Sequence, residues 1–269
     1  MMLALGAGAA TACSSVLGID EPEVVPTILG AGADATSDGA TGRDALVDAA
    51  ADALPFCPRD ASFCADFTSA NFAINWNDTP SPTLGQLERS GEGATEPGSL
   101  QVTVPQFTGT QNRTGIYLRR RIDTLRGERI HFEGSVRFDA IPEQGDTAPF
   151  ALTIGNALFY LYFTQAGWRV DDLYYCDGGC ADGQHRGTQA ATPLHTWERI
   201  SLDIELGGAG RFVATFTASP SNERLSFSLD PQFSASPRFD SYLAAGVAAA
   251  SPATTDRKIL IDDIALTVR

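Results

Sequence analysis

The sequence lacks the long apolar run that a membrane-spanning helix needs. Its apolar start, residues 1–12, is shorter than the about 20 residues that cross a bilayer. Basic residues are also scarce, because 19 Lys and Arg stand against 33 Asp and Glu, for a net charge of −14. The one short basic run, Arg119–Arg121, falls far short of the extended basic surface that nucleic acids require. We therefore expect no nucleic-acid partner.

Linear motifs of several enzyme classes are absent as well. The three histidines, His131, His185 and His195, form neither an H-x-x-x-H metal motif nor a Ser-His-Asp neighbourhood. No Walker-type phosphate loop occurs, and no stretch of the folded part shows a convincing ten-residue helical period. The sequence therefore predicts no catalytic residue from a linear motif and no helical domain.

Residues 1–12 have the apolar core and small-residue end of an export signal, and they lead into Ala10-Thr11-Ala12-Cys13. This ending resembles the lipobox of bacterial lipoproteins, which implies that Cys13 is acylated and becomes the mature N-terminus. No Lys or Arg precedes Cys13, whereas an export signal begins with a basic stretch, so we expect a start codon further upstream. The resemblance predicts an exported protein that is lipid-anchored to the outer membrane and faces the periplasm or the cell surface.

Residues 13–56 are predicted to form an acidic tether. They are rich in Ala, Gly, Asp and Thr, and from Ser14 to Phe56 eight acidic residues stand against one arginine. A segment so poor in large apolar groups cannot offset its ordering entropy by burial, so we predict that it is disordered. It would hold the folded part, residues 57–269, away from the lipid surface.

Four further cysteines belong to the folded part: Cys57, Cys64, Cys176 and Cys180. In an exported protein an even number of cysteines is expected to pair as disulfides. Three pairings are possible, and we favour Cys57–Cys64 and Cys176–Cys180 because each pair is close in sequence. A four-cysteine zinc site is the alternative, and only the C-x3-C spacing suits it. A thioredoxin-like redox pair would need C-x-x-C, which is absent.

Period-two alternation dominates the folded part. In the segment 129–140, Phe132, Val136 and Phe138 fall on one face and polar residues on the other. The same alternation recurs in residues 198–206, 211–218 and 224–230. Such alternation is typical of half-buried strands in antiparallel sheets, and Gly- and Pro-rich turns separate the segments. About twelve strands in one domain predict an all-β fold, a two-layer antiparallel sandwich.

Four segments resemble one family of sandwiches. TWERISLDIEL (196–206) is similar to the W-x-x-I-x-L strand of concanavalin A-like and laminin G-like domains, and KILIDDIALTV (258–268) is similar to their closing strand. FCADFTSANFAINW (63–76) and SLQVTVP (99–105) resemble their first two strands. The resemblance implies a concanavalin A-like jelly roll, the fold of many lectins and glucanases. A pair of immunoglobulin-like sandwiches, linked by residues 139–149, is the alternative.

The FCPRDASFCADF opening (56–67), placed behind a lipobox and an acidic tether, also resembles uncharacterised lipoproteins of predatory and soil-dwelling deltaproteobacteria.

Acidic residues give only weak catalytic or metal candidates. The glucanases of the family carry E-x-D-x-x-E, which this chain lacks. Asp203 and Glu205 share a strand face, with Cα atoms about 6.6–6.8 Å apart, but acids alternating with apolar residues are typical of any solvated strand. Asp262 and Asp263 interrupt the alternation of the closing strand, so we expect a bulge there, with an acid that caps backbone N–H groups. A calcium site is the other interpretation, because Ca²⁺ prefers carboxylate and carbonyl oxygens; we expect no other cofactor.

Aromatic residues gather in the segment 157–175, which reads as two strands joined near Gly167. Phe159, Leu161 and Phe163 should point to one face and the intervening tyrosines to the other. Aromatic sheet faces can stack on sugar rings, and a Cys176–Cys180 hairpin would form a rim beside them. The predicted ligand-binding residues are Tyr160, Tyr162, Trp168, Tyr174, Tyr175, Asp177 and His185. Ordinary packing is the alternative, because aromatic residues are common in strands.

These features together predict a monomeric, surface-displayed lipoprotein with a lectin-like sandwich that binds a carbohydrate or another surface without catalysis. Two alternatives remain open. One is a glycoside hydrolase or lyase whose acids lie on separate strands. The other is a structural or adhesive protein that binds another surface protein.

Overall fold

The computed structural model describes residues 56–73, 75–77, 84–109, 115–122, 129–142, 145–164, 166–175, 183–187, 194–206, 212–231, 233 and 241–269. The predicted export signal, Cys13, nearly all of the tether, and Cys176, Asp177 and Cys180 lie outside these residues. Every regular element of the described part is a strand. None of the described residues forms a helix long and apolar enough to span a bilayer.

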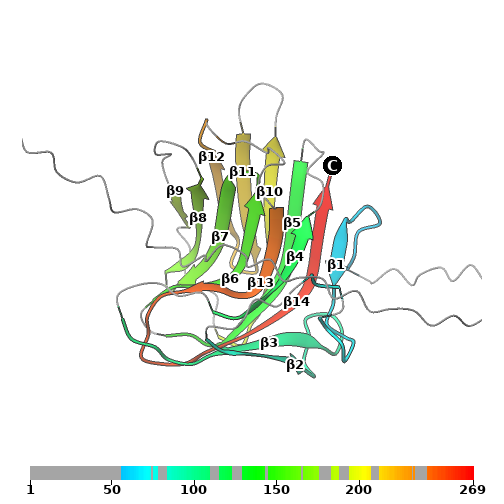
Figure 1. The fold of residues 1–269 in the computed structure, drawn as a ribbon, viewed down its shortest axis with the longest axis vertical. Coiled ribbons are helices and arrows are strands. Elements are labelled where there is room, and N and C mark those ends of the chain that lie inside the picture. The colour runs from blue at the N-terminus through cyan, green and yellow to red at the C-terminus, as the bar shows by residue number, and fades with distance from the viewer. Residues whose placement is uncertain are drawn as a thin grey trace, which may run out of the picture. The chain divides into compact units, whose positions relative to one another are not determined.

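The described residues form fourteen strands in two antiparallel sheets (Figure 1). The larger, eight-stranded sheet has the order β12-β11-β10-β5-β14-β3-β2, and β1 also pairs with β14. Its strands are β1 (Phe63–Ala65), β2 (Gln86–Ser90), β3 (Ser99–Val104), β5 (Arg129–Ala140), β10 (Trp197–Leu206), β11 (Phe212–Ser219), β12 (Glu223–Ser228) and β14 (Arg257–Val268).

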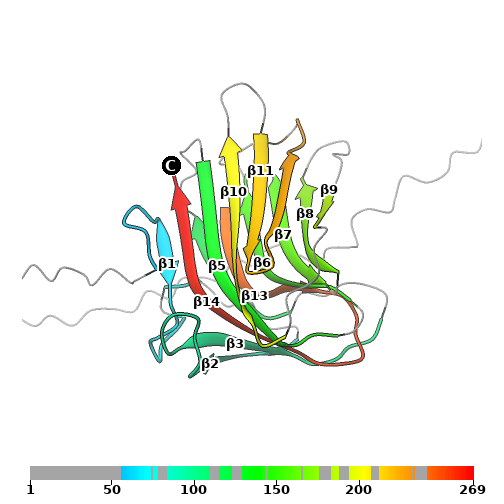
Figure 2. The same cartoon turned by 180° about the vertical axis from the view of Figure 1, so that it is seen from behind.

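The second, six-stranded sheet has the order β4-β13-β6-β7-β8-β9. Its strands are β4 (Tyr117–Ile122), β6 (Thr147–Ile154), β7 (Ala157–Thr164), β8 (Gly167–Tyr174), β9 (Gly183–Arg186) and β13 (Ser241–Ala250). The two sheets lie one behind the other, and the view from behind brings β10 and β11 to the front (Figure 2). The predicted two-layer antiparallel sandwich is therefore confirmed.

The alternative of two immunoglobulin-like sandwiches is wrong, because the chain does not divide at residues 139–149. β5 ends within the eight-stranded sheet at Ala140, and the next strand, β6, starts at Thr147 in the six-stranded sheet. These residues therefore cross from one layer to the other within a single sandwich.

The core lies between the sheets, where the inward side chains meet. Phe138 of β5 stacks on Phe163 of β7 with ring centroids 4.0 Å apart, and Phe132 meets Phe150 of β6 at 5.1 Å. Burial of such side chains stabilises the fold by roughly 1.5–3 kcal/mol each. Along β7, the predicted inward residues Phe159, Leu161 and Phe163 belong to this core; their exposed fractions are 0%, 1% and 2%.

The alternation of β14 breaks at Asp262 and Asp263, as the sequence predicts. The pairing of β14 with β5 shifts register between Asp262 and Ala265, and Asp263 adopts a positive φ of 49°. Such a bulge inserts an extra residue and re-aims the neighbouring side chains. Both aspartates consequently point into the protein, with exposed fractions of 1% and 4%.

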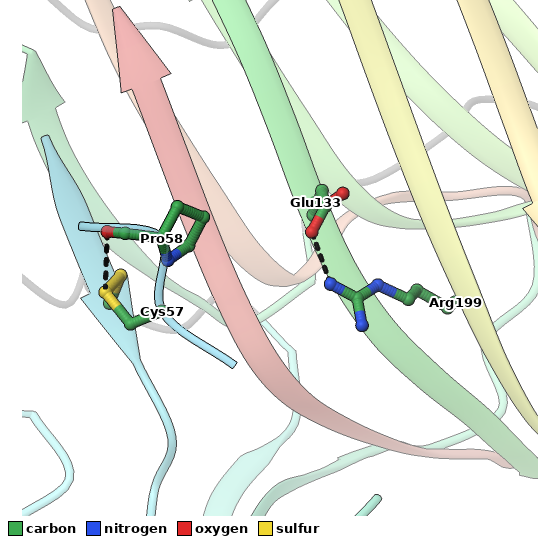
Figure 3. Close-up of a disulfide and its surroundings, with 5 residues drawn as sticks. Cys57, Pro58, Glu133 and Arg199 are labelled. Atoms are coloured by element: carbon green, nitrogen blue, oxygen red, sulfur yellow. Dashed lines mark hydrogen bonds and ion pairs between the residues drawn. A yellow bond between two sulfur atoms is a disulfide. The ribbon is translucent and has the colours of Figure 1, made fainter. Parts of the chain in front are cut away.

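A disulfide fixes the start of the described chain. Cys57 and Cys64 are joined, which is the local pairing that the sequence favours, with Cα atoms 6.0 Å apart (Figure 3). The bridged segment lies against β14, because Ser62 N donates to the Leu266 carbonyl at 2.7 Å and Val268 N donates to Ser62 Oγ at 3.2 Å. The second predicted bridge involves cysteines outside the described residues. The alternative of a four-cysteine zinc site is wrong, because Cys57 and Cys64 are oxidised to the disulfide and cannot bind zinc as thiolates.

Candidate functional site

Five of the six tyrosines lie on the outer face of the six-stranded sheet, away from the core. We call this group the tyrosine face; its members are Tyr117 of β4, Tyr160 and Tyr162 of β7, Tyr175 just after β8, and Tyr242 of β13. Tyr160 is at the centre, because the other four tyrosines all lie close enough to disfavour its ionisation.

Small side chains form the floor of the tyrosine face. Ala151 of β6 and Ala244 and Ala248 of β13 are at most 5% exposed although they point away from the core. Four of the tyrosines, Tyr162 excepted, pack against this floor. Because the middle strands carry methyl groups instead of bulky residues, rings from β4, β7 and β13 can lean toward one another.

Strand register aligns one row of side chains across the whole sheet. Arg119 pairs with Ala244, Ala244 with Ala151, Ala151 with Tyr160, and Tyr160 with Asp171. The row ends at Gln184 on β9. Five spacings between neighbouring strands make this row roughly 24 Å long.

Tyr160 keeps its proton at physiological pH. Burial raises the pKa of its phenol far above the usual value, and the neighbouring tyrosines raise it further. The Tyr160 ring lies 5.6 Å from the Tyr162 ring, centroid to centroid. Tyr160 therefore presents a partly exposed aromatic surface and a hydroxyl that can donate a hydrogen bond.

Arginines accompany the tyrosines. Arg119 Cζ lies 5.4 Å from the Tyr242 ring centroid, and Arg169 Cζ lies 4.4 Å from the Tyr162 ring centroid. Both distances are typical of cation–π contacts. Arg121 and Arg186 are exposed at opposite edges of the same face.

Two of the carboxylates near this face are already paired. Arg169 donates to both oxygens of Asp171, at 2.7 and 2.9 Å, and also contacts Asp146. Arg169 and Asp171 are buried, with exposed fractions of 6% and 8%. Among the described residues, four arginines and two aspartates lie on or beside this face, in a chain of net charge −14.

The predicted ligand-binding residues divide between the two faces of the sheet. Tyr160, Tyr162 and Tyr175 belong to the tyrosine face, and Asp177 lies outside the described residues. Trp168 is in the core, 1% exposed, with its ring 5.2 Å from Phe163 and its Nε1 donating to Glu198 at 2.9 Å. Trp168 pairs in register with Phe163, the residue after Tyr162 on β7. Because successive side chains of a strand point to opposite faces, Trp168 and Tyr162 lie on opposite faces of the sheet.

Tyr174 and His185 also point inward, at the edge between the sheets. Tyr174 donates to Asp172 Oδ2 at 2.6 Å, and His185 Nε2 contacts Asp172 Oδ1 at 3.0 Å. The His185 ring stacks on Phe227 of the other sheet at 3.6 Å between centroids. These residues join the layers and do not contribute to the tyrosine face.

The structure adds residues that the sequence did not reveal. Tyr117, Arg119 and Tyr242 come from β4 and β13, which are far from β7 in the chain and reach it only through strand pairing. The only sequence signal was the Arg119–Arg121 run, which the strand alternation splits between two faces. Arg120 points the other way, with Cζ 5.2 Å from the Phe63 ring centroid.

The acidic pair of β10 lies on the opposite layer. Asp203 Oδ1 accepts hydrogen bonds from Arg129 at 2.6 Å and contacts His131 Nδ1 at 3.0 Å. Glu205 is exposed and pairs in register with Arg129. Asp203 is therefore engaged in ion pairs, and both acids lie next to the positive charge of Arg129.

The two aspartates of the β14 bulge lie beneath residues 94 and 95. Ala94 N donates to Asp262 Oδ2 at 2.8 Å, and Thr95 Oγ1 donates to Asp263 Oδ1 at 2.8 Å, so both acids cap neighbouring groups. Asp262 Oδ1 is buried without a hydrogen-bond partner, and burial raises the pKa of Asp262 to about 7. An unpaired buried oxygen suits a hard cation.

No group of three or more His, Cys, Asp or Glu side chains among the described residues could hold a metal ion. Calcium at Asp262 and Asp263 would therefore need carbonyl oxygens as its remaining ligands, and the site stays a prediction.

Comparison with known proteins shows which solved structures have a similar fold. No protein-family model and no curated protein sequence matches the chain. Among solved structures, an endo-β-1,4-glucuronan lyase from the fungus Trichoderma reesei aligns with a TM-score of 0.53 and 13% identity, over 78% of this chain and 96% of that one. The fold is one that polysaccharide lyases use.

Two alginate lyases give similar alignments. The enzyme vAL-1 from Chlorella virus has a TM-score of 0.53 and 10% identity, over 78% of this chain and 100% of its own. A mutant of alginate lyase Aly36B in complex with alginate tetrasaccharide has a TM-score of 0.50 and 12% identity, over 78% and 94% of the two chains. At these identities the similarity establishes a jelly-roll-like β-sandwich and nothing about activity.

Proposed function

We propose that the chain binds an acidic polysaccharide on the tyrosine face. Tyr162 is buried, but the other four tyrosines are partly exposed and offer ring surfaces on which sugars can stack. Guanidinium groups bind carboxylates through charge-assisted hydrogen bonds. The observation that carries the proposal is the gathering of four tyrosines around Tyr160, with arginines beside them, in a strongly acidic chain.

The dimensions of the face suit a polymer. The row from Arg119 to Gln184 is roughly 24 Å long, enough for several consecutive sugar units. Arg119 and Arg121 at one edge and Arg186 at the other would contact carboxylates at separate points along the chain. The buried Arg169–Asp171 pair would hold the Tyr162 ring in place beneath them.

The solved structures with a similar sandwich support the ligand class. They are lyases of glucuronan and alginate, both polymers of uronic acids, and one of the structures contains an alginate tetrasaccharide. Because their identity to this chain is so low, only the class of polymer is carried over, and no residue role is.

The location remains part of the proposal. Acylation at Cys13 and an acidic tether would display the domain at the outer membrane. Metabolic labelling with an alkynyl fatty acid should mark the wild type and should vanish in Cys13→Ala; equal labelling of both would remove the anchor.

A binding panel tests the proposal. The purified chain should bind alginate and polygalacturonate but not dextran, and the affinity should fall as salt rises, because exposed charge pairs are screened. Arg119→Ala should weaken alginate binding by roughly threefold to tenfold. Arg224→Ala, an exposed arginine of β12 on the other sheet, is the matched control and should leave binding unchanged. Equal binding of dextran and alginate would contradict the acidic ligand class.

Elimination by a lyase is the second candidate, with the phenol of Tyr160 as its proton donor, although burial makes this phenol a weaker acid than an ordinary tyrosine. In such a reaction a base removes the proton beside the carboxylate, the bond to the leaving oxygen breaks, and the phenol protonates that oxygen. No histidine lies on the tyrosine face among the described residues, so the structure supplies an acid without a matching base. Ultraviolet absorbance of an unsaturated product, lost in Tyr160→Phe, would establish this activity.

Hydrolysis finds less support. Asp203 is engaged by Arg129 and His131. Glu198 and Glu223, which both accept hydrogen bonds from Trp168 in the core, are only 1% and 2% exposed. A polymer on the sheet surface cannot reach groups so deeply buried. Release of reducing ends from alginate without an unsaturated product would reverse this order of candidates.

A further inference from the structure

A cavity of about 260 Å³ lies on the outer face of the eight-stranded sheet, on the layer that does not carry the tyrosine face. It is lined by Pro58, Arg129, His131, Asp203, Thr267 and Arg269. Register places Asp203, His131 and Thr267 next to one another on β10, β5 and β14. Three paired strands therefore form a rigid floor for the cavity.

The disulfide-bridged segment forms one wall. Pro58 directly follows Cys57, and Figure 3 shows it at β14, with the Glu133–Arg199 pair on the neighbouring strands. Arg269 Nε donates to Asp60 Oδ2 at 2.6 Å, which ties the end of β14 to the same segment. The bridge thus holds Pro58 over the sheet without a flexible loop.

Three of the lining residues, Asp203, Arg129 and Arg269, each have a polar atom that makes no hydrogen bond to another described residue. Arg129 donates through Nε and Nη2, at 3.0 and 2.6 Å, and both bonds end on Asp203 Oδ1. His131 Nδ1 contacts the same oxygen at 3.0 Å. Asp203 Oδ2 and Arg129 Nη1 take no part in these bonds. Arg269 likewise contacts Asp60 through Nε and Nη2, and its Nη1 takes no part in this contact.

His131 carries a positive charge in this arrangement. Its Nε2 lies 3.0 Å from Glu133 Oε1, and its Nδ1 lies 3.0 Å from Asp203 Oδ1. A neutral imidazole has one N–H, so both contacts are hydrogen bonds only in the protonated ring. The hydrogen bond to Glu133 is the largest cause of the raised pKa of His131, and the bond to Asp203 adds to it. His131, Arg129 and Arg269 then supply three positive charges, and Asp203, Glu133 and Asp60 supply three negative charges.

We propose that this cavity binds a single neutral sugar residue. Asp203 Oδ2 would accept hydrogen bonds from sugar hydroxyls, and Nη1 of Arg129 and of Arg269 would donate to sugar oxygens. A simple anion would instead place a second negative charge against Asp203 Oδ2, which a neutral sugar does not. The volume is below the 300–1,000 Å³ of most small-molecule sites, so it suits one sugar unit and not a polymer. The proposal is independent of polysaccharide binding to the tyrosine face.

Histidine-ring NMR on the full chain tests the proposal, because only three histidines contribute signals. The probes are D-glucose, D-galactose, D-mannose, N-acetyl-D-glucosamine and inorganic phosphate. At least one sugar should shift the His131 signals saturably below about 100 mM, a weak affinity typical of few contacts. Asp203→Asn and Arg269→Ala should each weaken this binding by about tenfold. Glu88→Gln, an exposed carboxylate of β2 in the same sheet but away from the cavity lining, is the matched control and should leave it unchanged.

Three results would overturn the proposal. One is the absence of a saturable shift with every sugar; another is a shift with phosphate alone. The third is sugar binding of equal strength in the wild type and in Arg269→Ala, whose side chain is 66% exposed and removable without loss of the fold. Tyr160→Ala should leave the sugar titration unchanged, which separates this site from the tyrosine face.

Discussion

Replacing Asp262 by Asn should make the protein more stable at alkaline pH and flatten its dependence on pH. Asp262 is 1% exposed, its Oδ1 has no hydrogen-bond partner, and burial raises its pKa from 3.8 to about 7. The folded state therefore binds the proton more tightly than the unfolded state does. Stability from this group is present below pH 4 and declines as pH rises toward 7.

The size of this effect follows from the shift. One pKa unit corresponds to 1.36 kcal/mol, so a rise from 3.8 to about 7 implies a loss on the order of 4 kcal/mol between pH 4 and 8. Asn keeps the shape and can still accept the hydrogen bond from Ala94 N without a charge. We expect Asp262→Asn to exceed the wild type at pH 8 by up to roughly that amount, and to differ little at pH 4.

Urea unfolding at pH 4, 6 and 8 in the presence of a chelator measures this difference. Glu205→Gln, an exposed acid, is the control and should follow the wild type at every pH. Calcium should then restore the stability of the wild type at pH 8 and should have no effect on Asp262→Asn, because a cation favours the ionised carboxylate. If Asp262→Asn is less stable than the wild type at pH 8 in chelator, the reasoning about an unpaired buried charge is wrong.

Three further predictions concern stability. His131→Gln should destabilise the protein most below pH 6.5, because the charged ring makes both hydrogen bonds, and less as pH rises through the raised pKa of His131. Urea unfolding midpoints at pH 5.5 and 9 measure this, and an equal loss of stability at the two pH values would contradict it. Trp168→Ala should lower the free energy of unfolding by about 3–5 kcal/mol, but the protein that stays folded should bind alginate like the wild type. Weaker alginate binding by folded Trp168→Ala would mean that Trp168 belongs to the binding site. Joint replacement of Cys57 and Cys64 by Ala should lower stability by roughly 2–3 kcal/mol, and unchanged thermal unfolding would contradict this.

The layer architecture could be predicted because period-two alternation is a local property of the chain. Phe132, Phe138 and Phe163 point into the core, as the alternation of apolar and polar residues along their strands predicts. The break at Asp262 and Asp263 was visible for the same reason, since a bulge disturbs the alternation in place. Which strands lie next to each other was not predictable, because pairing is decided by contacts between segments far apart in sequence.

The candidate site shows the same limit. Tyr160 and Tyr162 were identified from one strand, but Tyr117 and Tyr242 reach them only because β4 and β13 join the same sheet. The prediction that Trp168 shares a face with Tyr162 is wrong. Trp168 pairs with Phe163, and which residue of β7 it pairs with depends on the register across the β7–β8 turn. A residue count in the β7–β8 hairpin does not settle this register without the structure.

Affinity for alginate in two variants tests the central claim most directly. Tyr160→Ala removes the ring at the centre of the tyrosine face, and Arg224→Ala alters an exposed side chain on the other sheet. The account predicts that Tyr160→Ala weakens alginate binding by about tenfold, equivalent to about 1.4 kcal/mol, while Arg224→Ala binds like the wild type. Equal affinity of Tyr160→Ala and wild type, with both proteins folded, would contradict it.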